Sequence, residues 1–409
     1  MSIATRWFST MRHLKACFFF VLLMGNLIMQ DASARQLESV PTALGRNGYV
    51  EYWEGNMPLV ISAPHGGHLI PAEIDDRTSG TTVTDSNTKE TALAFREAIF
   101  KRTGHHPYVV ISNLKRTKLD PNREIIEAAE SNIWAEQAWT EYHGFIESAK
   151  SEITLSFGSG LYVDLHGHGH SIQRLELGYL LSSNELVLSD DQLNSGNLVE
   201  SSSIRTLVSS TSFSFSELLR GQNSLGTLFS SSGIPATPSL SQPNPGQGNP
   251  FFSGGYSTRR HGSADGGRIS GVQIEAYYAG LRNSSSNRAF FAEKAALVFQ
   301  TFLRETYNWD SMSTGMQIAV LPEFFHLRTY AYPNPFSKRV SLTFSATSLS
   351  PFHLKIVDAL GRLVQEKVVP HSFGLETIIP MDTHRWPSGV YTYQIRSQTH
   401  LGYGLIVKQ

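Results

Sequence analysis

Apolar and polar positions follow two different rhythms along most of the chain. Short apolar runs rich in β-branched and aromatic residues end at glycines or polar residues and predict buried strands. The predicted strands cover residues 59–63, 108–112, 162–170, 175–181 and 271–277. The predicted helices, where apolar residues recur at helical spacing, cover residues 88–102, 125–150, 204–219 and 288–306. This alternation predicts an α/β domain from Tyr49 to about Tyr307, with a long loop at 233–255, where Pro, Gly, Asn and Ser are frequent.

The helix and strand rhythm breaks at residues 308–329, which we interpret as a linker. Short strands separated by turns follow it. They are predicted at residues 342–344, 353–357, 363–364, 376–379, 389–395 and 403–407. Several of them alternate apolar with polar residues, as strands do when one face of an antiparallel sheet is exposed. Residues 330–409 therefore predict a small antiparallel β-sandwich.

The N-terminus has the three parts of a secretory signal peptide. A basic segment is followed by the apolar run 17–29 and by the small residues 32–34, and the run is shorter than the ~20 residues that span a bilayer. We expect a signal peptide at 1–34 that is removed after Ala34, leaving no transmembrane anchor. The single cysteine, Cys17, lies inside it, so the mature fold is expected to contain no disulfide.

The charge balance narrows the range of partners. The chain has 34 basic and 35 acidic residues, so its formal net charge is −1. A near-neutral protein has no excess of positive charge for nucleic acid or an anionic membrane. We therefore expect no nucleic-acid partner.

Histidines gather at the predicted carboxyl ends of strands. His166, His168 and His170 occupy alternate positions where one strand runs into glycines, and His65 follows another strand in Pro-His-Gly-Gly. Imidazole is the commonest metal ligand in proteins. The alternative interpretation of this segment is a His-rich exposed loop. The other residues of the chain that suit a metal centre, described in the next paragraph, favour a metal site.

Four other residues have chemistry that suits such a site. Glu275 stands alone in an apolar strand, which is costly for a carboxylate unless it has a partner or a task. Arg123 suits a substrate carboxylate, although an exposed ion pair is its ordinary role. Asp85 by its spacing is a helix cap. Asp164 projects to the side of His166 if the strand is regular, either orienting that imidazole or facing the core. Together the parts indicate a hydrolytic metal centre.

Five motifs in order resemble the N-formylglutamate amidohydrolase family, which is related in fold to zinc carboxypeptidases. They are Pro64-His-Gly-Gly67, Asn122-Arg123, Asp164-Leu-His-Gly-His168, Gly254-Gly-Tyr through His261-Gly262, and Gln273-Ile-Glu275. The resemblance covers about residues 48–307. It implies a mixed sheet flanked by helices, a zinc cofactor, and a catalytic domain with these bounds.

The resemblance also implies a ligand set. His65 and His166 match metal-binding histidines, and Asp85 before Thr88-Lys-Glu90 matches an acidic ligand of the related poly-γ-glutamate hydrolases. An insertion from His68 to Thr84 separates Asp85 from His65, so three other residues remain alternatives for this ligand. They are Glu73, Asp75 and His68.

The other roles implied by the resemblance concern catalysis and substrate binding. Glu275 matches the catalytic glutamate, and Arg123 matches the arginine that binds the substrate's carboxylate. Asn122 belongs to the same substrate-binding pair. The expected secondary substrate contacts are His168, Arg259, Arg260 and His261. All of this requires the rings of His65 and His166 to lie within about 6 Å of each other.

The end of the chain resembles the C-terminal sorting domain of the type IX secretion system. Tyr332-Pro-Asn-Pro-Phe336, Asp358-Ala-Leu-Gly-Arg362 and Pro387-Ser-Gly-Val-Tyr391 carry this resemblance. It implies that the protein meets the type IX machinery and reaches the outer surface or the medium.

Three functions fit the sequence. The first is an exported zinc amidohydrolase that cleaves the amide of an N-acyl amino acid or glutamyl compound, which is not a standard peptide bond. The second is a secreted metallopeptidase or amidase that acts on γ-glutamyl polymer or cell-wall peptide, an interpretation that export favours. The third is a surface binding protein without catalysis.

Overall fold

The computed structural model describes residues 40–195, 197–310, 325–327, 329–345, 352–359, 361–370, 376–397 and 400–409. The predicted signal peptide and most of the predicted linker at 308–329 lie outside these residues, so both remain predictions. Among the described residues, no helix has both the length and the apolar character needed to cross a bilayer.

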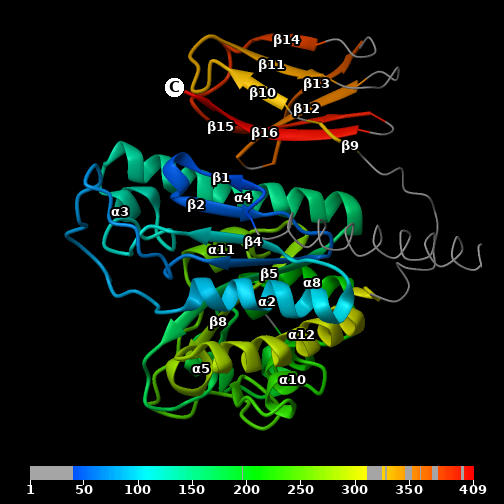
Figure 1. Ribbon diagram of the computed structural model, residues 1–409. Coiled ribbons are helices and arrows are strands. Elements are labelled where there is room, and N and C mark those ends of the chain that lie inside the picture. The colour runs from blue at the N-terminus through cyan, green and yellow to red at the C-terminus, as the bar shows by residue number, and fades with distance from the viewer. Residues whose placement is uncertain are drawn as a thin grey trace, which may run out of the picture. The chain divides into compact units, whose positions relative to one another are not determined.

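A mixed β-sheet between helices forms the larger part of the protein (Figure 1). Its main strands are β2 (Val50–Trp53), β3 (Leu59–Ala63), β4 (Tyr108–Ser112), β5 (Gly160–His168), β6 (Leu175–Gly178), β7 (Ala236–Thr237) and β8 (Ile269–Tyr277). Their order across the sheet is β2-β4-β3-β5-β8-β6-β7. The central strands β4, β3, β5 and β8 are parallel. Strand β2 pairs antiparallel with β4, and β6 pairs antiparallel with β8 and parallel with β7. The predicted α/β class with a mixed sheet is confirmed.

Long helices cover both faces of the sheet. Helix α4 (Ile133–Phe157) lies on one face, and helices α2 (Thr88–Thr103) and α12 (Ser285–Tyr307) pack together on the other (Figure 1). Phe95 of α2 meets Phe291 of α12 edge to face, with ring centroids 4.8 Å apart. The close packing of these buried apolar faces makes the sheet rigid. Polar side chains at the carboxyl ends of its strands are therefore held in fixed positions.

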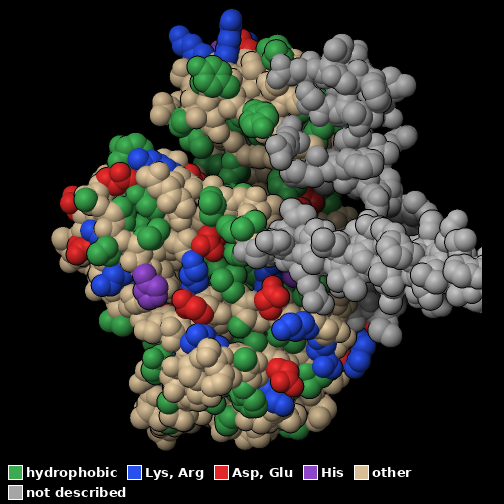
Figure 2. All heavy atoms as spheres, viewed as in Figure 1, with side chains coloured by type: hydrophobic (Ala, Val, Ile, Leu, Met, Phe, Trp, Pro, Cys, Tyr) green, Lys and Arg blue, Asp and Glu red, His purple; other side chains and the backbone are tan. Residues whose placement is uncertain are grey.

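Shorter elements complete this part of the chain. They are β1 (Ala43–Leu44), η1 (Arg46–Gly48), α3 (Ile125–Ala129), α5 (Ser183–Leu186), α6 (Asp190–Asn194), α7 (Leu198–Ser201), α8 (Arg205–Ser210), α9 (Phe215–Arg220), α10 (Leu225–Ser231), α11 (Tyr256–His261) and η2 (Tyr278–Arg282). The predicted loop at 233–255 contains only the two residues of β7 as regular structure. On the face in Figure 2, acidic and basic side chains are interspersed, as the near-neutral net charge leads one to expect.

The helix predicted at 125–150 is wrong in one respect, because it is two helices. Glu130 and Ser131 have φ of 45° and 63°, in the left-handed region that ends a helix. The side chain of Asn132 then accepts hydrogen bonds from the backbone N–H groups that open α4. Apolar spacing continues across this break, which is why periodicity alone does not reveal it.

The helix predicted at 204–219 is also two helices, α8 and α9. The side chain of Ser214 accepts a hydrogen bond from the backbone of Glu217, whose carboxylate receives the Ser214 backbone N–H in return. This capping box starts a new helix inside the apolar pattern.

The C-terminal region forms two small sheets. Strands β10 (Thr329–Tyr332), β11 (Arg339–Ser345) and β14 (Glu376–Asp382) make one, and β9 (Phe325–His326), β12 (Phe352–Asp358), β13 (Leu363–Val369), β15 (Gly389–Arg396) and β16 (His400–Lys408) make the other. Apart from the short pairing of β9 with β16, the strands are antiparallel. Buried and exposed residues alternate along β12, so the two sheets enclose one apolar core. The predicted antiparallel β-fold is confirmed.

Candidate metal centre and pocket

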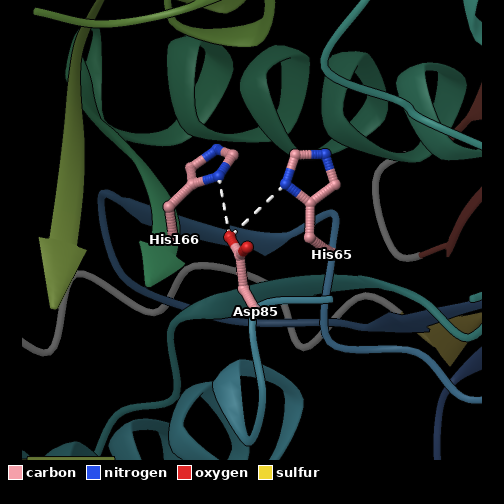
Figure 3. A group of neighbouring side chains, drawn as sticks. All are labelled: His65, Asp85 and His166. Carbon is pink, nitrogen blue, oxygen red and sulfur yellow. Dashed lines mark hydrogen bonds and ion pairs between the residues drawn. The ribbon is translucent and has the colours of Figure 1, made fainter. Parts of the chain in front are cut away.

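Two histidines reach the same point because their strands are parallel neighbours. Ser62 of β3 pairs with Asp164 of β5, so His65 and His166 both lie at the carboxyl edge of the sheet. Asp85, just before α2, approaches the same edge, where its carboxylate also accepts the backbone N–H of Gly167. Figure 3 shows the two imidazoles and this carboxylate facing one another.

The three side chains converge closely. Nδ1 of His65 lies 3.4 Å from Oδ2 of Asp85, and Nδ1 of His166 lies 3.3 Å from the same oxygen (Figure 3). The two ring centroids are 4.8 Å apart, within the separation that a shared ion requires. All three residues are buried. Ligand atoms on one tetrahedral ion at ~2.0–2.1 Å would lie roughly 3.3–3.4 Å apart, so the spacing fits.

The second nitrogen of each imidazole is already used. Nε2 of His65 donates to Asp120 at 2.6 Å, and Nε2 of His166 donates to Asp164 at 2.9 Å. In a neutral ring this leaves the lone pair of Nδ1 facing the Asp85 carboxylate. Nδ1 of His65 is buried and has no hydrogen-bond partner among the described residues. Two imidazole nitrogens and a carboxylate oxygen that face one another at these distances fit a cation between them.

The electrostatics of the cluster also favour a cation. Burial alone would raise the pKa of Asp85, but His166 and His65 outweigh it and hold that pKa well below its usual range. Burial opposes a charge on His166, yet Asp164 and Asp85 hold its pKa well above the usual range. Without a metal, the site therefore retains an extra proton; a divalent ion supplies positive charge in its place.

Asp120 is a functional candidate that sequence reasoning missed. It is fully buried, it accepts from His65, and Arg116 donates to its other oxygen at 3.0 Å. An acceptor on the far nitrogen of a metal-binding histidine is a general requirement, but only the fold reveals which carboxylate provides it.

Replacing Asp120 with asparagine is expected to weaken metal affinity by ~10–100-fold, because the amide no longer fixes the His65 tautomer as firmly as a carboxylate does. Titration of metal-free protein against a competing chromogenic chelator measures this change. An affinity equal to that of the wild type would show that Asp120 does not orient a metal ligand.

Glu275 lies beside the cluster and outside it. It is directly opposite His166 in the pairing of β5 with β8, and its Oε1 accepts from Gln273 at 2.9 Å. Burial raises the pKa of Glu275 to about 8; His166 opposes this shift, and Asp85 and Glu176 add to it. A carboxyl group with a raised pKa next to a metal cluster has the properties of a proton-transfer group.

A cavity of about 520 Å³ opens over the site. Asp85, His166 and Glu275 contribute to its wall. The other residues that line it are Thr81, Val83, Arg116, Asn122, Arg123, Gly167, His168, Gly169, His170, Phe252, Gly254, Gly255 and Gln273. Its volume falls in the range of about 300–1,000 Å³ typical of small-molecule sites.

Arg123 and Asn122 both reach the cavity. The guanidinium of Arg123 is one-third exposed, donates to Glu127 at 3.0 Å and to the Asn122 carbonyl at 2.7 Å, and keeps Nη2 without a partner among the described residues. Asn122 is buried and accepts from the backbone of Ser257 at 2.8 Å. Arg123 is thus available to a substrate, whereas Asn122 ties two segments of the wall together.

The structure does not bring all the expected substrate contacts into the cavity. Arg259 is exposed, 3.9 Å from Asp265, and Arg260 donates to the hydroxyl of Tyr256. His261 is fully buried and lies between His143 and Glu147. None of the three lines the cavity.

The alternative metal ligands lie apart from the cluster. His68 and Asp75 are exposed. Glu73 accepts from the hydroxyl of Tyr49 at 2.5 Å and is paired with Arg46. Among the described residues, Asp85 is the acid that meets both His65 and His166.

In the C-terminal region, residues 330–408 match the family described as the secretion system C-terminal sorting domain. This region is a type IX sorting domain. The protein is therefore directed through type IX secretion to the outer surface or the medium, as predicted. A search of curated proteins found no match.

Solved structures resemble parts of the chain only distantly. An N-formylglutamate amidohydrolase from Ralstonia eutropha JMP134 is 12% identical, with 66% of this chain and 96% of that chain covered and a TM-score of 0.38. The gene product Atu2144 from Agrobacterium tumefaciens is 13% identical, with 67% and 97% covered and a TM-score of 0.37. PorZ of the type IX secretion system of Porphyromonas gingivalis is 19% identical, with 20% and 11% covered and a TM-score of 0.15. At these values the likenesses establish no activity.

Proposed function

We propose that the exported protein is a zinc-dependent amidohydrolase that cleaves the amide of an N-acyl amino acid or glutamyl compound. The observation that supports it most is the bare, buried Nδ1 of His65, which faces Asp85 together with Nδ1 of His166. The set of two imidazoles and one carboxylate is a ligand set typical of catalytic zinc, which keeps one position open.

The roles of the residues follow from their places. His65, Asp85 and His166 would hold the ion, with Asp120 and Asp164 fixing the rings. A bound zinc ion lowers the pKa of water to ~7 and polarises a carbonyl group.

The proton and the substrate are handled by other residues. Glu275 would take a proton from the attacking water and pass it to the leaving nitrogen, so that the amide and water become an acid and an amine. Arg123 would hold the substrate's carboxylate through its free Nη2.

A second candidate has one observation in its favour. Type IX export places the enzyme where it meets polymers rather than intracellular metabolites. This favours a secreted peptidase or amidase that acts on γ-glutamyl polymer or cell-wall peptide, with the same centre and the same roles. A surface binding protein without catalysis is the third candidate.

A substrate panel with and without a chelator tests the proposal. Purified protein is expected to contain about one zinc ion per chain. It should hydrolyse N-formyl-L-glutamate, a γ-glutamyl dipeptide or a muropeptide, lose that activity with dipicolinate, and regain it with Zn²⁺. Stoichiometric metal without hydrolysis of any panel member would favour the binding protein, and a protein that binds no metal would contradict the centre itself.

A further inference from the structure

Arg282 is a buried cation that the proposed mechanism does not use. It is the last residue of η2, the short helical segment directly after β8, and only 3% of it is exposed. It does not line the cavity. Within the described structure its side chain donates hydrogen bonds to backbone carbonyls and to no carboxylate. A buried guanidinium without a bonded anion is costly, so its position calls for a physical reason.

The carbonyls that Arg282 contacts belong to three different segments. Nε donates to the carbonyl of Ala276 at 3.0 Å, and Nη1 donates to the carbonyl of Ser86. Nη2 makes a longer contact of 3.5 Å with the carbonyl of His168. One planar group thus reaches the carboxyl ends of β8 and β5 and the segment just before α2. A guanidinium suits this arrangement because its donors point in several fixed directions within one plane.

Each contact lies one or two residues from a side chain with a proposed role. The first directly follows Glu275, the second directly follows Asp85, and the third comes two residues after His166. A carbonyl that is so close along the chain moves with the neighbouring side chain. A displacement of the guanidinium would therefore displace two proposed metal ligands and the proposed base together.

The glycine after His166 leaves room for the guanidinium. A methyl group on Gly167 would overlap with the central carbon and both terminal nitrogens of Arg282. The φ of Gly167 lies outside the left-handed region, so its backbone conformation does not itself require glycine. The N–H of Gly167 donates to Asp85 at 3.1 Å, so the segments of both ligands meet beside this side chain.

The backbone of Arg282 is fixed as well. Its carbonyl accepts a hydrogen bond from the side-chain amide of Asn87 at 2.8 Å and another from Arg288 at 3.0 Å. Asn87 is the residue at which α2 begins, and Arg288 belongs to α12. These two helices pack together on one face of the sheet, so the side chain of Arg282 extends from a rigid base.

The charge of Arg282 also acts on the site. Burial lowers the pKa of Arg282, and the nearby carboxyl groups of Asp85 and Glu275 oppose that shift. The guanidinium therefore offsets part of the negative charge that these two residues bring into a buried region. It does so without a direct ion pair.

We infer that Arg282 is a positioning residue for the proposed centre. Its guanidinium fixes the three segments that carry the ligands Asp85 and His166 and the acid–base group Glu275. This inference rests on the proposed function, because it assumes that these residues form one metal centre. It adds a residue that acts through the backbone and not through contact with substrate.

Replacing Arg282 with lysine is expected to weaken metal affinity by ~10–100-fold, because an ammonium group keeps the charge but cannot reach three carbonyls in one plane. We expect kcat to fall by ~10–100-fold, since a misplacement of about 1 Å can cost that much. KM should change by less than ~3-fold, because Arg282 does not line the cavity. Competition with a chromogenic chelator measures the affinity. The visible absorption spectrum of Co²⁺-loaded protein reports the ligand geometry without any substrate.

Arg96→Lys is the matched control. Arg96 is 6% exposed and donates to the carbonyl of Pro107 at 2.8 Å, just before β4 begins and thus at the amino edge of the sheet. The two substitutions remove similarly buried guanidinium groups at opposite edges of the sheet. We expect a comparable loss of thermal stability in both variants, but wild-type metal affinity and an unchanged Co²⁺ spectrum in Arg96→Lys.

Two further experiments address the contact itself. In Arg282→Ala, guanidinium ion at a concentration too low to unfold the protein is expected to restore part of the metal affinity, and the same concentration of NaCl to restore none. Gly167→Ala should weaken metal binding because its methyl group displaces the guanidinium, and it tests the same contact if the Arg282 variants do not fold. The double variant Gly167→Ala/Arg282→Lys should show less than the sum of the two losses in binding free energy, because both changes act on one contact.

The outcomes separate this inference from the proposed function. Wild-type metal affinity and an unchanged Co²⁺ spectrum in Arg282→Lys would overturn the inference, even in a less stable variant. Additive losses in the double variant would also overturn it, as would equal rescue by NaCl. Metal-loaded wild type that hydrolyses no member of the earlier panel would contradict the proposed function, and the affinity and the spectrum would still decide the role of Arg282. A wild type that binds no metal would overturn the centre and this inference together.

Discussion

Replacing Glu275 with glutamine is expected to lower kcat by ~10²–10⁴-fold and to leave metal content unchanged. Glutamine has nearly the same size and keeps a hydrogen bond to Gln273, but it cannot accept the proton of the attacking water. The metal content is expected to persist because Glu275 lies outside the group formed by His65, Asp85 and His166. Turnover on the best panel substrate, measured beside zinc content, checks both parts.

A stability measurement provides a control for this variant. Burial raises the pKa of Glu275 from the usual 4.5 to about 8 in the metal-free protein. The folded state therefore keeps a proton that the unfolded chain releases, so this contribution to stability is complete below pH ~4.5 and is lost as pH rises toward 8. Metal-free Glu275→Gln should thus be the more stable protein at pH 8, with little difference at pH 4. Near-normal turnover in this variant would show that another group is the base.

Replacing His166 with alanine is expected to reduce metal affinity by at least ~100-fold and to abolish hydrolysis. The change removes one of the three proposed ligands and leaves Asp164 without its hydrogen-bonded partner. Zinc content after dialysis, and competition with a chelator for the ion that remains, measure the loss. The melting temperature should also become insensitive to chelator, because little bound ion is left to stabilise the fold.

The matched control is His68→Ala. His68 is exposed and lies three residues after His65, so its removal deletes an imidazole near the site without touching the cluster. We expect wild-type zinc content and turnover. If His68→Ala lost the metal and His166→Ala kept it, the ligand set would be wrong.

The sequence predicts much of the fold because its strands are short, apolar and bounded by glycines. The bounds predicted for β3 and β4 are those of the structure. The histidines were found because they follow such strands, and parallel strands end at one edge. The two missed helix breaks depend on left-handed residues at Glu130 and Ser131 and on a serine cap, which leave apolar spacing intact.

The acids of the site were harder to predict than its histidines. Spacing alone makes Asp85 a helix cap, and in the structure it does precede α2 while facing both imidazoles. The sequence does not single out Asp120 or Glu176, because acidic residues are common in turns and at strand ends. Only the fold shows that they accept hydrogen bonds from His65 and His170. The resemblance places His261 near substrate, whereas the structure buries it beside Glu147, away from the residues that line the cavity.

His65 and Asp85, two of the three converging side chains, are twenty positions apart in the sequence. They therefore lie at the two ends of one segment of the chain. An ion held by both would close that stretch into a ring, much as a covalent cross-link does, and would lower the entropy of the unfolded chain. The single cysteine of the chain is Cys17. A bound ion would therefore stabilise the exported protein in the way that a disulfide stabilises other exported proteins.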